Sequence, residues 1–285
     1  VLTTLMTPTE GSASIDGHDV VRAADKVRSL IGLVPQDLTV DEDLTGRENM
    51  YLQAKLYHVP KDTADKRIRE VLELVGLTDA AHRKVETYSG GMRKRLELAE
   101  GLIHRPRVLF LDEPTLSLDV QTRAVIWDHI RRLRNEQNMT IFITTHYMDE
   151  ADALCDRIAI IDHGKIVASD TPSNLKEGLG GDVIELSLAK GSPDIGEALA
   201  TIPYVKDVKK GGDSLRIKVV KGEEALPQII EKVMKIGVSV SKVSLTKPTL
   251  DEVYLEYTGR SLRDIQSSSE EALRMRISLR RMRAH

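Results

Sequence analysis

Short apolar runs alternate with helical stretches from residue 12 to about 178, and this alternation constrains the fold more than any other feature. The candidate strands are the apolar runs at 30–34, 108–111, 139–144 and 157–161. Unbroken apolar runs of this length are typical of strands that are buried on both faces of a parallel sheet. Because helical stretches separate them, we expect an α/β fold with a mostly parallel sheet covered on both sides.

Residues 46–104 are mainly helical by period. Ile68, Val71 and Val75 recur at three- and four-residue steps, which places them on one face of a helix. We therefore expect a helical subdomain inserted in the α/β layer. At the start of the chain, residues 1–6 resemble the last turns of a helix that stops at Pro8.

The pattern changes after the glycine-rich segment 178–181, which predicts a linker. Residues 182–257 follow the order β-α-β-β-α-β, which is the order of a small α+β ferredoxin-like domain. A helix at 249–257 is expected to close that domain. The predicted organisation is thus a domain at 1–178, a small accessory domain at 182–257 and a tail at 258–285.

The tail at 258–285 is basic and amphipathic. From 259 onward it has seven arginines against three acidic residues, and its apolar residues repeat at helical steps. It is either a solvated or partner-bound helix, or a segment that contacts an acidic membrane surface or a membrane subunit.

Composition narrows the possible functions. The chain has 41 Lys and Arg against 44 Asp and Glu, a formal net charge of −3, so we expect no nucleic-acid partner recruited by bulk positive charge. Its one cysteine, Cys155, excludes an internal disulfide and a zinc site built on several cysteines. No apolar run approaches the roughly 20 residues that span a bilayer.

Two adjacent carboxylates follow the apolar run at 108–111. Asp112 and Glu113 would lie at the carboxyl end of a buried strand, where open α/β sheets bind ligands. Neighbouring carboxylates in a dry cleft favour a cation, and Mg²⁺ beside nucleotide phosphates supplies one. Asp112 would then face the metal and Glu113 would orient a water molecule. The alternative is an ordinary strand that ends in two solvated acids.

Other polar residues also stand at strand ends or helix starts. The segment 89–91, Ser-Gly-Gly, precedes a helix whose N-terminal amides and dipole favour an anion, or it is a plain turn. His146 follows the run at 139–144, as a phosphate donor or as a surface histidine. Gln36 follows the run at 30–34, as a polar amide or as a ligand of metal and water.

Taken together and in order, these residues resemble the ATP-binding-cassette (ABC) ATPases. The resemblance covers residues 1–178 and implies a P-loop NTPase-like fold. The matching segments are the Q-loop at Val34–Asp37, the signature motif at Tyr88–Met92, the Walker B strand at Leu109–Thr115, the D-loop at Ser117–Asp119 and the switch histidine at His146.

The resemblance implies a role for each matched residue of the Walker B strand, for the Q-loop glutamine and for the switch histidine. Asp112 would hold Mg²⁺, with Gln36 as a further metal ligand. Glu113 would be the general base or water orienter, with an effect of roughly 10²–10⁴ on rate. His146 and Gln36 would sense the γ-phosphate of ATP.

The resemblance also implies a partner. In the family two ATPase domains face each other head to tail and enclose ATP between them, so the chain would form a homodimer or pair with a second ATPase domain. Ser89, Gly90 and Gly91 would complete the partner's site, and Asp119 would be a further nucleotide-binding residue. ATP binding would hold the dimer together and hydrolysis would release it.

Three departures from the family pattern stand out. Tyr88 replaces a leucine and is expected still to pack, and Ser117 replaces a glycine, which alters the freedom of the backbone. The pattern G-x-x-x-x-G-K-[ST] of the phosphate-binding loop (Walker A) is absent, since the one Gly-Lys pair, 164–165, is followed by isoleucine. We expect that loop upstream of Val1, in an N-terminally truncated sequence, and expect this chain alone to be inactive.

The resemblance can be narrowed to the drug-exporter branch of the daunorubicin-resistance type. The run Tyr147–Asp152, the run Ser89–Arg95 and the appended small domain match that branch. Its members pair with a separate membrane protein, which implies an ATPase subunit that lies peripherally on the cytoplasmic face of the membrane and drives export. The alternatives are a non-transport ABC ATPase and a non-catalytic regulatory fragment.

Overall fold

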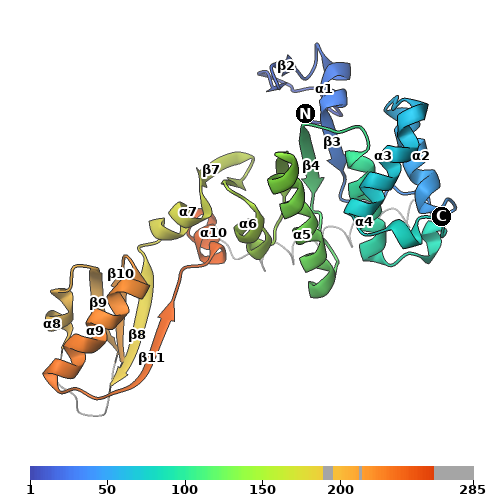
Figure 1. The fold of residues 1–285 in the computed structure, drawn as a ribbon. Helices are drawn as coiled ribbons and strands as arrows, with labels where there is room; N and C mark the ends of the chain where they lie inside the picture. The colour runs from blue at the N-terminus through green and yellow to red at the C-terminus, as the bar shows by residue number, and fades with distance from the viewer. Residues whose placement is uncertain (189–194, 212–213, 260–285) are drawn as a thin grey trace, which may run out of the picture. The chain divides into compact units, whose positions relative to one another are not determined.

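The computed structural model describes residues 1–188, 195–211 and 214–259, which belong to two compact units, 1–146 and 147–285 (Figure 1). Each unit has its own hydrophobic core. Among the described residues, no helix is both long and apolar enough to cross a membrane. The predicted tail at 258–285 lies outside the described residues from 260 onward.

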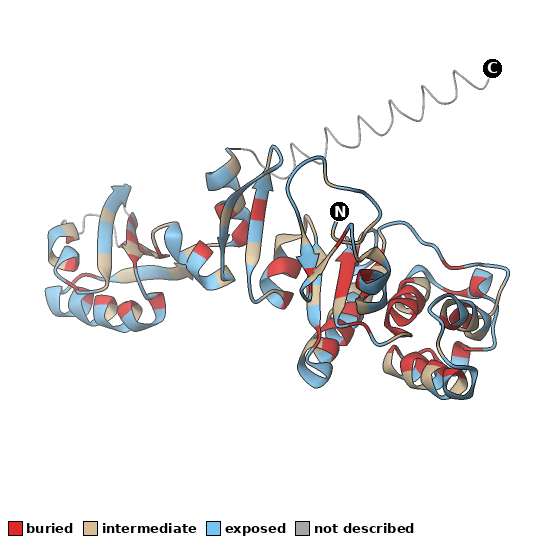
Figure 2. Ribbon diagram, turned by 90° about the horizontal axis from the view of Figure 1, so that it is seen from above, coloured by how far each residue is buried: buried red, intermediate tan, exposed pale blue. Residues whose placement is uncertain are grey.

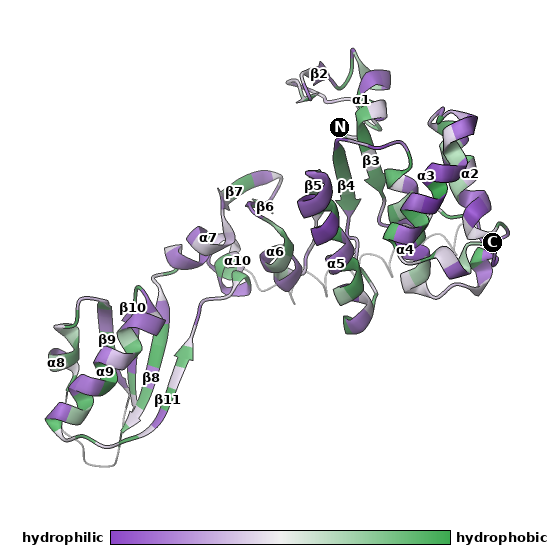
Figure 3. Cartoon of the chain, viewed as in Figure 1, coloured by the Kyte–Doolittle hydropathy of each residue, from purple (hydrophilic) through white to green (hydrophobic). Residues whose placement is uncertain are grey.

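The first unit is built on a parallel sheet. Its strands are β3 (Ile31–Val34), β4 (Val108–Asp112) and β5 (Thr140–Thr144), in the order β3-β4-β5. Val34 pairs with Leu111, and Asp112 pairs with Thr144. The central strand β4 is apolar and buried along most of its length, as Figures 2 and 3 show. Three of the four predicted strands are therefore confirmed as strands of the parallel sheet.

Short elements precede the sheet. They are the strands β1 (Ser14–Ile15) and β2 (His18–Asp19) and the helix α1 (Ala24–Leu30). The helix expected to end within residues 1–6 is absent: those residues form turns and bends, and Thr4 has a φ of 63°. Leu2 packs against the core, but Leu5 and Met6 are exposed, so the segment buries too little apolar surface to offset the cost of helix nucleation.

A helical subdomain lies between β3 and β4 in the sequence, as predicted. Its elements are α2 (Gly46–Leu56), α3 (Lys61–Leu74), the 3₁₀ turns η1 (Thr78–Ala80) and η2 (Val85–Thr87), and α4 (Gly90–Leu102). Thr45 and Glu48 form a reciprocal capping box that begins α2. Met50, Ile68 and Leu96 are buried, so the helices pack through the apolar faces that their periodicity predicts.

Helix α5 (Val120–Gln137) leads from β4 to β5. Asp119 caps its N-terminus, and it ends at Asn138, which has the left-handed conformation that commonly stops a helix. Ile126, Ile130 and Leu133 are buried along one face of this helix. The helix therefore supplies part of the apolar surface on which this unit folds.

The second unit begins with a small layer of mixed structure. It contains α6 (Met148–Leu154), β6 (Ile158–Asp162), β7 (Lys165–Asp170) and α7 (Pro172–Gly178). The predicted strand at 157–161 is present as β6, but it pairs antiparallel with β7 rather than with the parallel sheet. His163 and Gly164 between them both have positive φ, the combination that a tight two-residue hairpin turn requires.

A four-stranded antiparallel sheet follows, in the strand order β11-β8-β10-β9. The sequence order is the predicted β-α-β-β-α-β, and the sheet order is that of a ferredoxin-like fold. The elements are β8 (Asp182–Leu188), α8 (Gly196–Ala200), β9 (Val205–Gly211), β10 (Ser214–Val219), α9 (Gly222–Ile236) and β11 (Val240–Thr246).

The last described helix, α10 (Leu250–Thr258), does not close this small sheet as expected. Leu250 and Val253 are buried in a cluster with Ala151, Ile160 and Leu175, which belong to α6, β6 and α7. The apolar pair three residues apart on α10 thus finds its partners on the elements before the ferredoxin-like sheet. The predicted domain limits at 178 and 182 remain predictions.

Candidate active site

Two carboxylates stand at the carboxyl edge of the parallel sheet, where β4 ends. The two residues are Asp112 and Glu113, and Thr144, at the end of the neighbouring strand β5, contacts both of them. Its hydroxyl donates a hydrogen bond to Asp112 Oδ1, and the backbone N–H of Glu113 donates to Thr144 O at 3.0 Å and to its Oγ1 at 3.2 Å. The end of β5 therefore fixes the positions of both acids.

Glu113 and His146 meet at this edge. Glu113 Oε2 lies 2.8 Å from His146 Nδ1, and the two side chains are only 19% and 31% exposed. This contact is an ion pair when the imidazole is protonated. Glu113 has a φ of 48°, a left-handed conformation that is costly for a glutamate. Such backbone conformations cluster at functional sites, where the surrounding structure maintains them.

Gln36 leaves the sheet at the same edge. Val34 pairs in parallel with Leu111, so the segment after β3 begins beside the segment that contains Asp112. Gln36 is exposed, and its backbone carbonyl is 3.4 Å from Lys94 Nζ of α4. The structure thus places Gln36, Asp112, Glu113 and His146 on one edge of one sheet.

The predicted signature residues begin α4. Ser89 is the N-cap, and its hydroxyl accepts a hydrogen bond from the N–H of Met92 at 3.3 Å. A Cβ at Gly91 would lie 2.3 Å from Thr122 Cγ2 of α5. Glycine at 91 therefore avoids a clash with Thr122 where the starts of the two helices approach closely.

Asp119 lies beside this close approach. Its carboxylate caps α5 by accepting hydrogen bonds from Thr122 N at 3.0 Å and from Thr122 Oγ1 at 2.6 Å. These bonds to Thr122 hold the pKa of Asp119 below its usual value. Thr122 therefore links Asp119 to the Ser89–Gly91 segment, which makes a second group of predicted site residues.

Two of the three departures from the family pattern, Tyr88 and Ser117, can be seen in the structure. Tyr88 is buried, as expected, and its hydroxyl donates a hydrogen bond of 2.6 Å to Ala80 O. Ser117 has a φ of 62°, in the left-handed region where glycine is tolerated without cost. The serine therefore retains the backbone conformation at the expense of local strain.

The oxygen donors at this edge suit a magnesium ion that is also coordinated by water and nucleotide phosphates. Within the described part of the chain, no group of three or more His, Cys, Asp or Glu side chains is arranged to hold a metal by itself. Asp112 is exposed at the strand end and offers a carboxylate oxygen. Mg²⁺ is commonly held by one or two carboxylates together with water and nucleotide phosphates, and that is the coordination these residues allow.

Several residues of the site were not predicted from the sequence. Thr144 and Thr122 organise the two groups through hydrogen bonds, but a threonine at a strand end or in a helix is not distinctive. Lys94 and Glu97 are buried charges on α4 and contact the segment around Gln36. The sequence could have indicated Lys94 and Glu97, because charged residues three apart on an otherwise apolar helix face need partners.

Comparisons with known proteins identify the family. Residues 1–116 match the family model described as ABC transporter, and residues 171–258 match the model of the C-terminal domain of DrrA1-3-like ATP-binding proteins. The daunorubicin resistance ATP-binding protein DrrA3 of Streptomyces coeruleorubidus is 42% identical over 260 residues, which cover 91% of this chain and 82% of that protein.

Two further similarities are informative. The linearmycin resistance ATP-binding protein LnrL of Bacillus subtilis is 35% identical over 89% of this chain and 82% of its own length. A solved dimeric ATP-binding cassette in a post-hydrolysis state, bound to ADP and Pi, is 27% identical. It superposes with a TM-score of 0.53 over 59% of this chain and 76% of that one.

Proposed function

The chain belongs to the ABC transporter family of ATP-binding proteins, in the daunorubicin-resistance type, and we propose that it is the ATP-hydrolysing subunit of an exporter. The observation that supports this most strongly is the Glu113–His146 contact beside Asp112, at the sheet edge where such folds bind ligands. Relatives named for drug resistance over most of the chain support export as the process that ATP drives.

We propose a membrane protein and a second ATPase domain as partners. An ATPase subunit needs a separate transport pathway, and relatives named for resistance or for Nod factor export are consistent with one. A homodimer is the simplest pairing, in line with the dimeric cassette that this fold resembles. The chain would then lie peripherally on the cytoplasmic face of the membrane.

In the proposed mechanism each residue at the sheet edge has one task. Glu113 would accept or orient the proton of the attacking water, and its contact with His146 would hold its carboxylate in place. Asp112 and Gln36 would hold Mg²⁺, which supplies charge neutralisation for the phosphate oxygens when bound. Thr144 would keep the two acids in register through its hydrogen bonds.

The second group of residues would act across the dimer. Ser89 with Gly90 and Gly91 would present the start of α4 to the nucleotide of the partner, since helix N-termini favour phosphate. Asp119, which caps α5 beside them, would belong to the same surface. In this arrangement one ATP requires residues from two chains.

The missing phosphate-binding pattern leads to a direct test. We expect the 285-residue chain to bind ATP weakly and to hydrolyse it negligibly, because nothing in the sequence matches G-x-x-x-x-G-K-[ST]. Fusing a strand–loop–helix segment with that pattern ahead of Val1 should confer ATP binding and turnover on the chain. Micromolar binding of radiolabelled ATP by the unmodified chain, or no turnover by the fusion, would contradict the proposal.

Mixing this chain with another ABC ATPase tests the second group of residues separately. An ABC ATPase whose own signature serine is replaced should gain turnover when this chain is added, because Ser89 would complete its site. A Ser89→Ala variant of this chain should give no such gain, whereas Glu113→Gln should leave the gain intact. Equal gains with both variants would refute the role of Ser89.

A further inference from the structure

Ionisable side chains line the face of α4 that is turned toward the protein interior. Lys94, Glu97 and Glu100 are three residues apart, and each is at most 6% exposed. A buried charge is costly unless it is paired and hydrogen-bonded, and an apolar pair of similar size is often at least as stable. The contacts of Lys94 and Glu97 indicate what they do.

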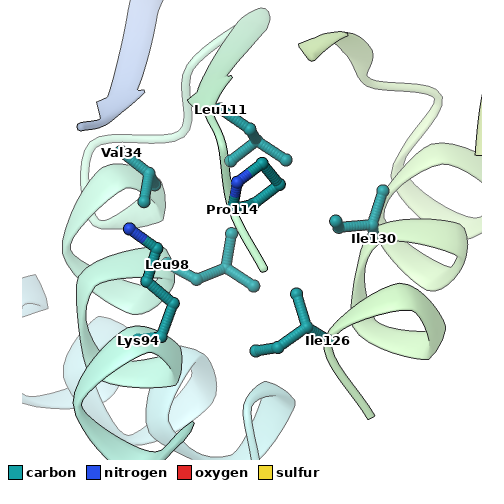
Figure 4. A pocket seen from close by; sticks show the side chains of 7 residues that line it. All are labelled: Val34, Lys94, Leu98, Leu111, Pro114, Ile126 and Ile130. Atoms are coloured by element: carbon teal, nitrogen blue, oxygen red, sulfur yellow. The ribbon is translucent and has the colours of Figure 1, made fainter. Parts of the chain in front are cut away.

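Lys94 contacts the start of the Gln36 segment. Its Nζ donates a hydrogen bond to Pro35 O at 2.7 Å and lies 3.4 Å from Gln36 O. The stem of Lys94 lines a cavity of about 10 Å³ with apolar neighbours such as Val34 and Leu98, as Figure 4 shows. The methylene groups are thus packed like a core residue while the ammonium group reaches the loop backbone.

Glu97 contacts the other end of the same segment. Its Oε1 accepts a hydrogen bond from Thr39 N at 2.5 Å and lies 3.2 Å from Thr39 Oγ1. Its Oε2 lies 3.1 Å from Lys94 Nζ, an ion pair without the geometry of a hydrogen bond. One ion pair on α4 therefore holds the loop on both sides of Gln36.

The attachment to the helical subdomain continues beyond Thr39. The buried side chain of Asn49, on α2, accepts from Asp41 N and donates to Asp41 O, both at 2.9 Å. Arg93, on α4, pairs with Glu42 at 2.6 Å. At the other end of the loop, the pairing of β3 with β4 stops at Val34.

We propose that Lys94 and Glu97 are positioning residues that make residues 35–39 a part of the helical subdomain. Gln36 would then move with Ser89 and α4, and the backbone would flex between Val34 and Pro35. The consequence for catalysis rests on the proposed function: any movement of the signature helix would shift Gln36 relative to Asp112. The attachment itself does not depend on ATP.

Amide hydrogen exchange tests the attachment in the full chain. Lys94→Met together with Glu97→Leu replaces the ion pair by apolar side chains of similar size, which is expected to preserve the fold. We expect exchange at the Thr39 amide to be at least tenfold faster in this double variant. Amides of β4 should exchange as before, and the midpoint of thermal unfolding should not fall. If the ion pair contributed to stability alone, the midpoint of thermal unfolding would fall and exchange at Thr39 would stay as it is in the parent chain.

Two single variants make the test specific. Glu97→Gln keeps an acceptor for Thr39 N and should leave its exchange within about twofold, which distinguishes the hydrogen bond from the charge. Glu100→Gln, on the same face of α4, should have no effect at Thr39, because Glu100 contacts Gln53 instead. Unchanged protection of Thr39 in the double variant would overturn the proposal.

The phosphate-loop fusion separates this inference from the proposed function. The double variant should lower the ATP turnover of an active fusion by about tenfold or more while ATP binding persists. Faster exchange at Thr39 with unchanged turnover would overturn the consequence for Gln36 and leave the attachment standing. If the fusion has no activity at all, the proposed function fails, and the exchange result still decides whether the loop is held by α4.

Discussion

Replacement of Glu100 by glutamine should stabilise the first unit, and the gain should grow with pH. Glu100 is buried on α4, and burial together with the neighbouring Glu97 raises its pKa from an ordinary value of 4.5 to about 8. The folded chain therefore keeps this carboxyl protonated at neutral pH, whereas the unfolded chain ionises it. Glutamine has nearly the shape of the protonated acid and can still accept a hydrogen bond from Gln53.

The magnitude follows from proton linkage. Because the folded state binds the additional proton, the free energy of unfolding of the wild type falls as pH rises from 4.5 to about 8. Each pH unit in that window costs about 1.4 kcal/mol, so at pH 7 the penalty is about 3 kcal/mol as an upper bound. Glu100→Gln removes it, and the two proteins should be equally stable near pH 4.5.

Urea unfolding followed by tryptophan fluorescence measures this gain. The chain has a single tryptophan, Trp127, which lies on α5 in the first unit. The stability difference should be close to zero at pH 4.5 and should reach its maximum at about pH 8. Glu73→Gln, at an exposed position on α3, is the control and should show no such trend. A difference that does not vary with pH would refute the reasoning.

Further substitutions test the packing of the site, all by the same unfolding measurement. Ser117→Gly should stabilise by about 0.5–1 kcal/mol, because it relieves a φ of 62°; a loss of stability would show that the serine side chain compensates. Gly91→Ala should destabilise by about 1–3 kcal/mol, because its Cβ would clash with Thr122 Cγ2, and a second change, Thr122→Ser, should recover most of that loss. No recovery would mean that the clash is elsewhere. Tyr88→Phe should cost about 0.5–1.5 kcal/mol, because Ala80 O loses the hydroxyl and keeps the hydrogen bond from Arg83 N, and a change below about 0.3 kcal/mol would show that water replaces the hydroxyl.

Much of the fold could be predicted because its strands are distinct in sequence. The run 108–111 is apolar without interruption and flanked by helical periods, and it is β4 at the centre of the parallel sheet. The order of elements in 182–246 sufficed for the ferredoxin-like sheet. Its alternating residues, such as Ile184 and Leu186, show which face is buried.

Apart from the helix expected within residues 1–6, the failures concern the partners of elements rather than the elements themselves. Helix α10 was predicted, but its apolar pair at Leu250 and Val253 carries no information about which surface it covers. The same holds for β6, whose composition suits a parallel sheet and an antiparallel hairpin equally well. The positive φ of His163 and Gly164 decides between them, and that is a property of the turn.

The candidate site, too, was predictable only in part. Motif order was enough to bring Gln36, Asp112, Glu113 and His146 to one sheet edge. It did not reveal how they are held, because the hydrogen bonds of Thr144 depend on the register between β4 and β5.

The central claim is that Glu113, held by His146, activates the water that cleaves ATP. The most direct measurement is single-turnover hydrolysis by the phosphate-loop fusion, compared between the parent and its Glu113→Gln variant, with ATP binding measured in parallel. We predict that the variant binds ATP as tightly as the parent and cleaves it roughly 10²–10⁴-fold more slowly. Cleavage within threefold of the parent rate would contradict the account.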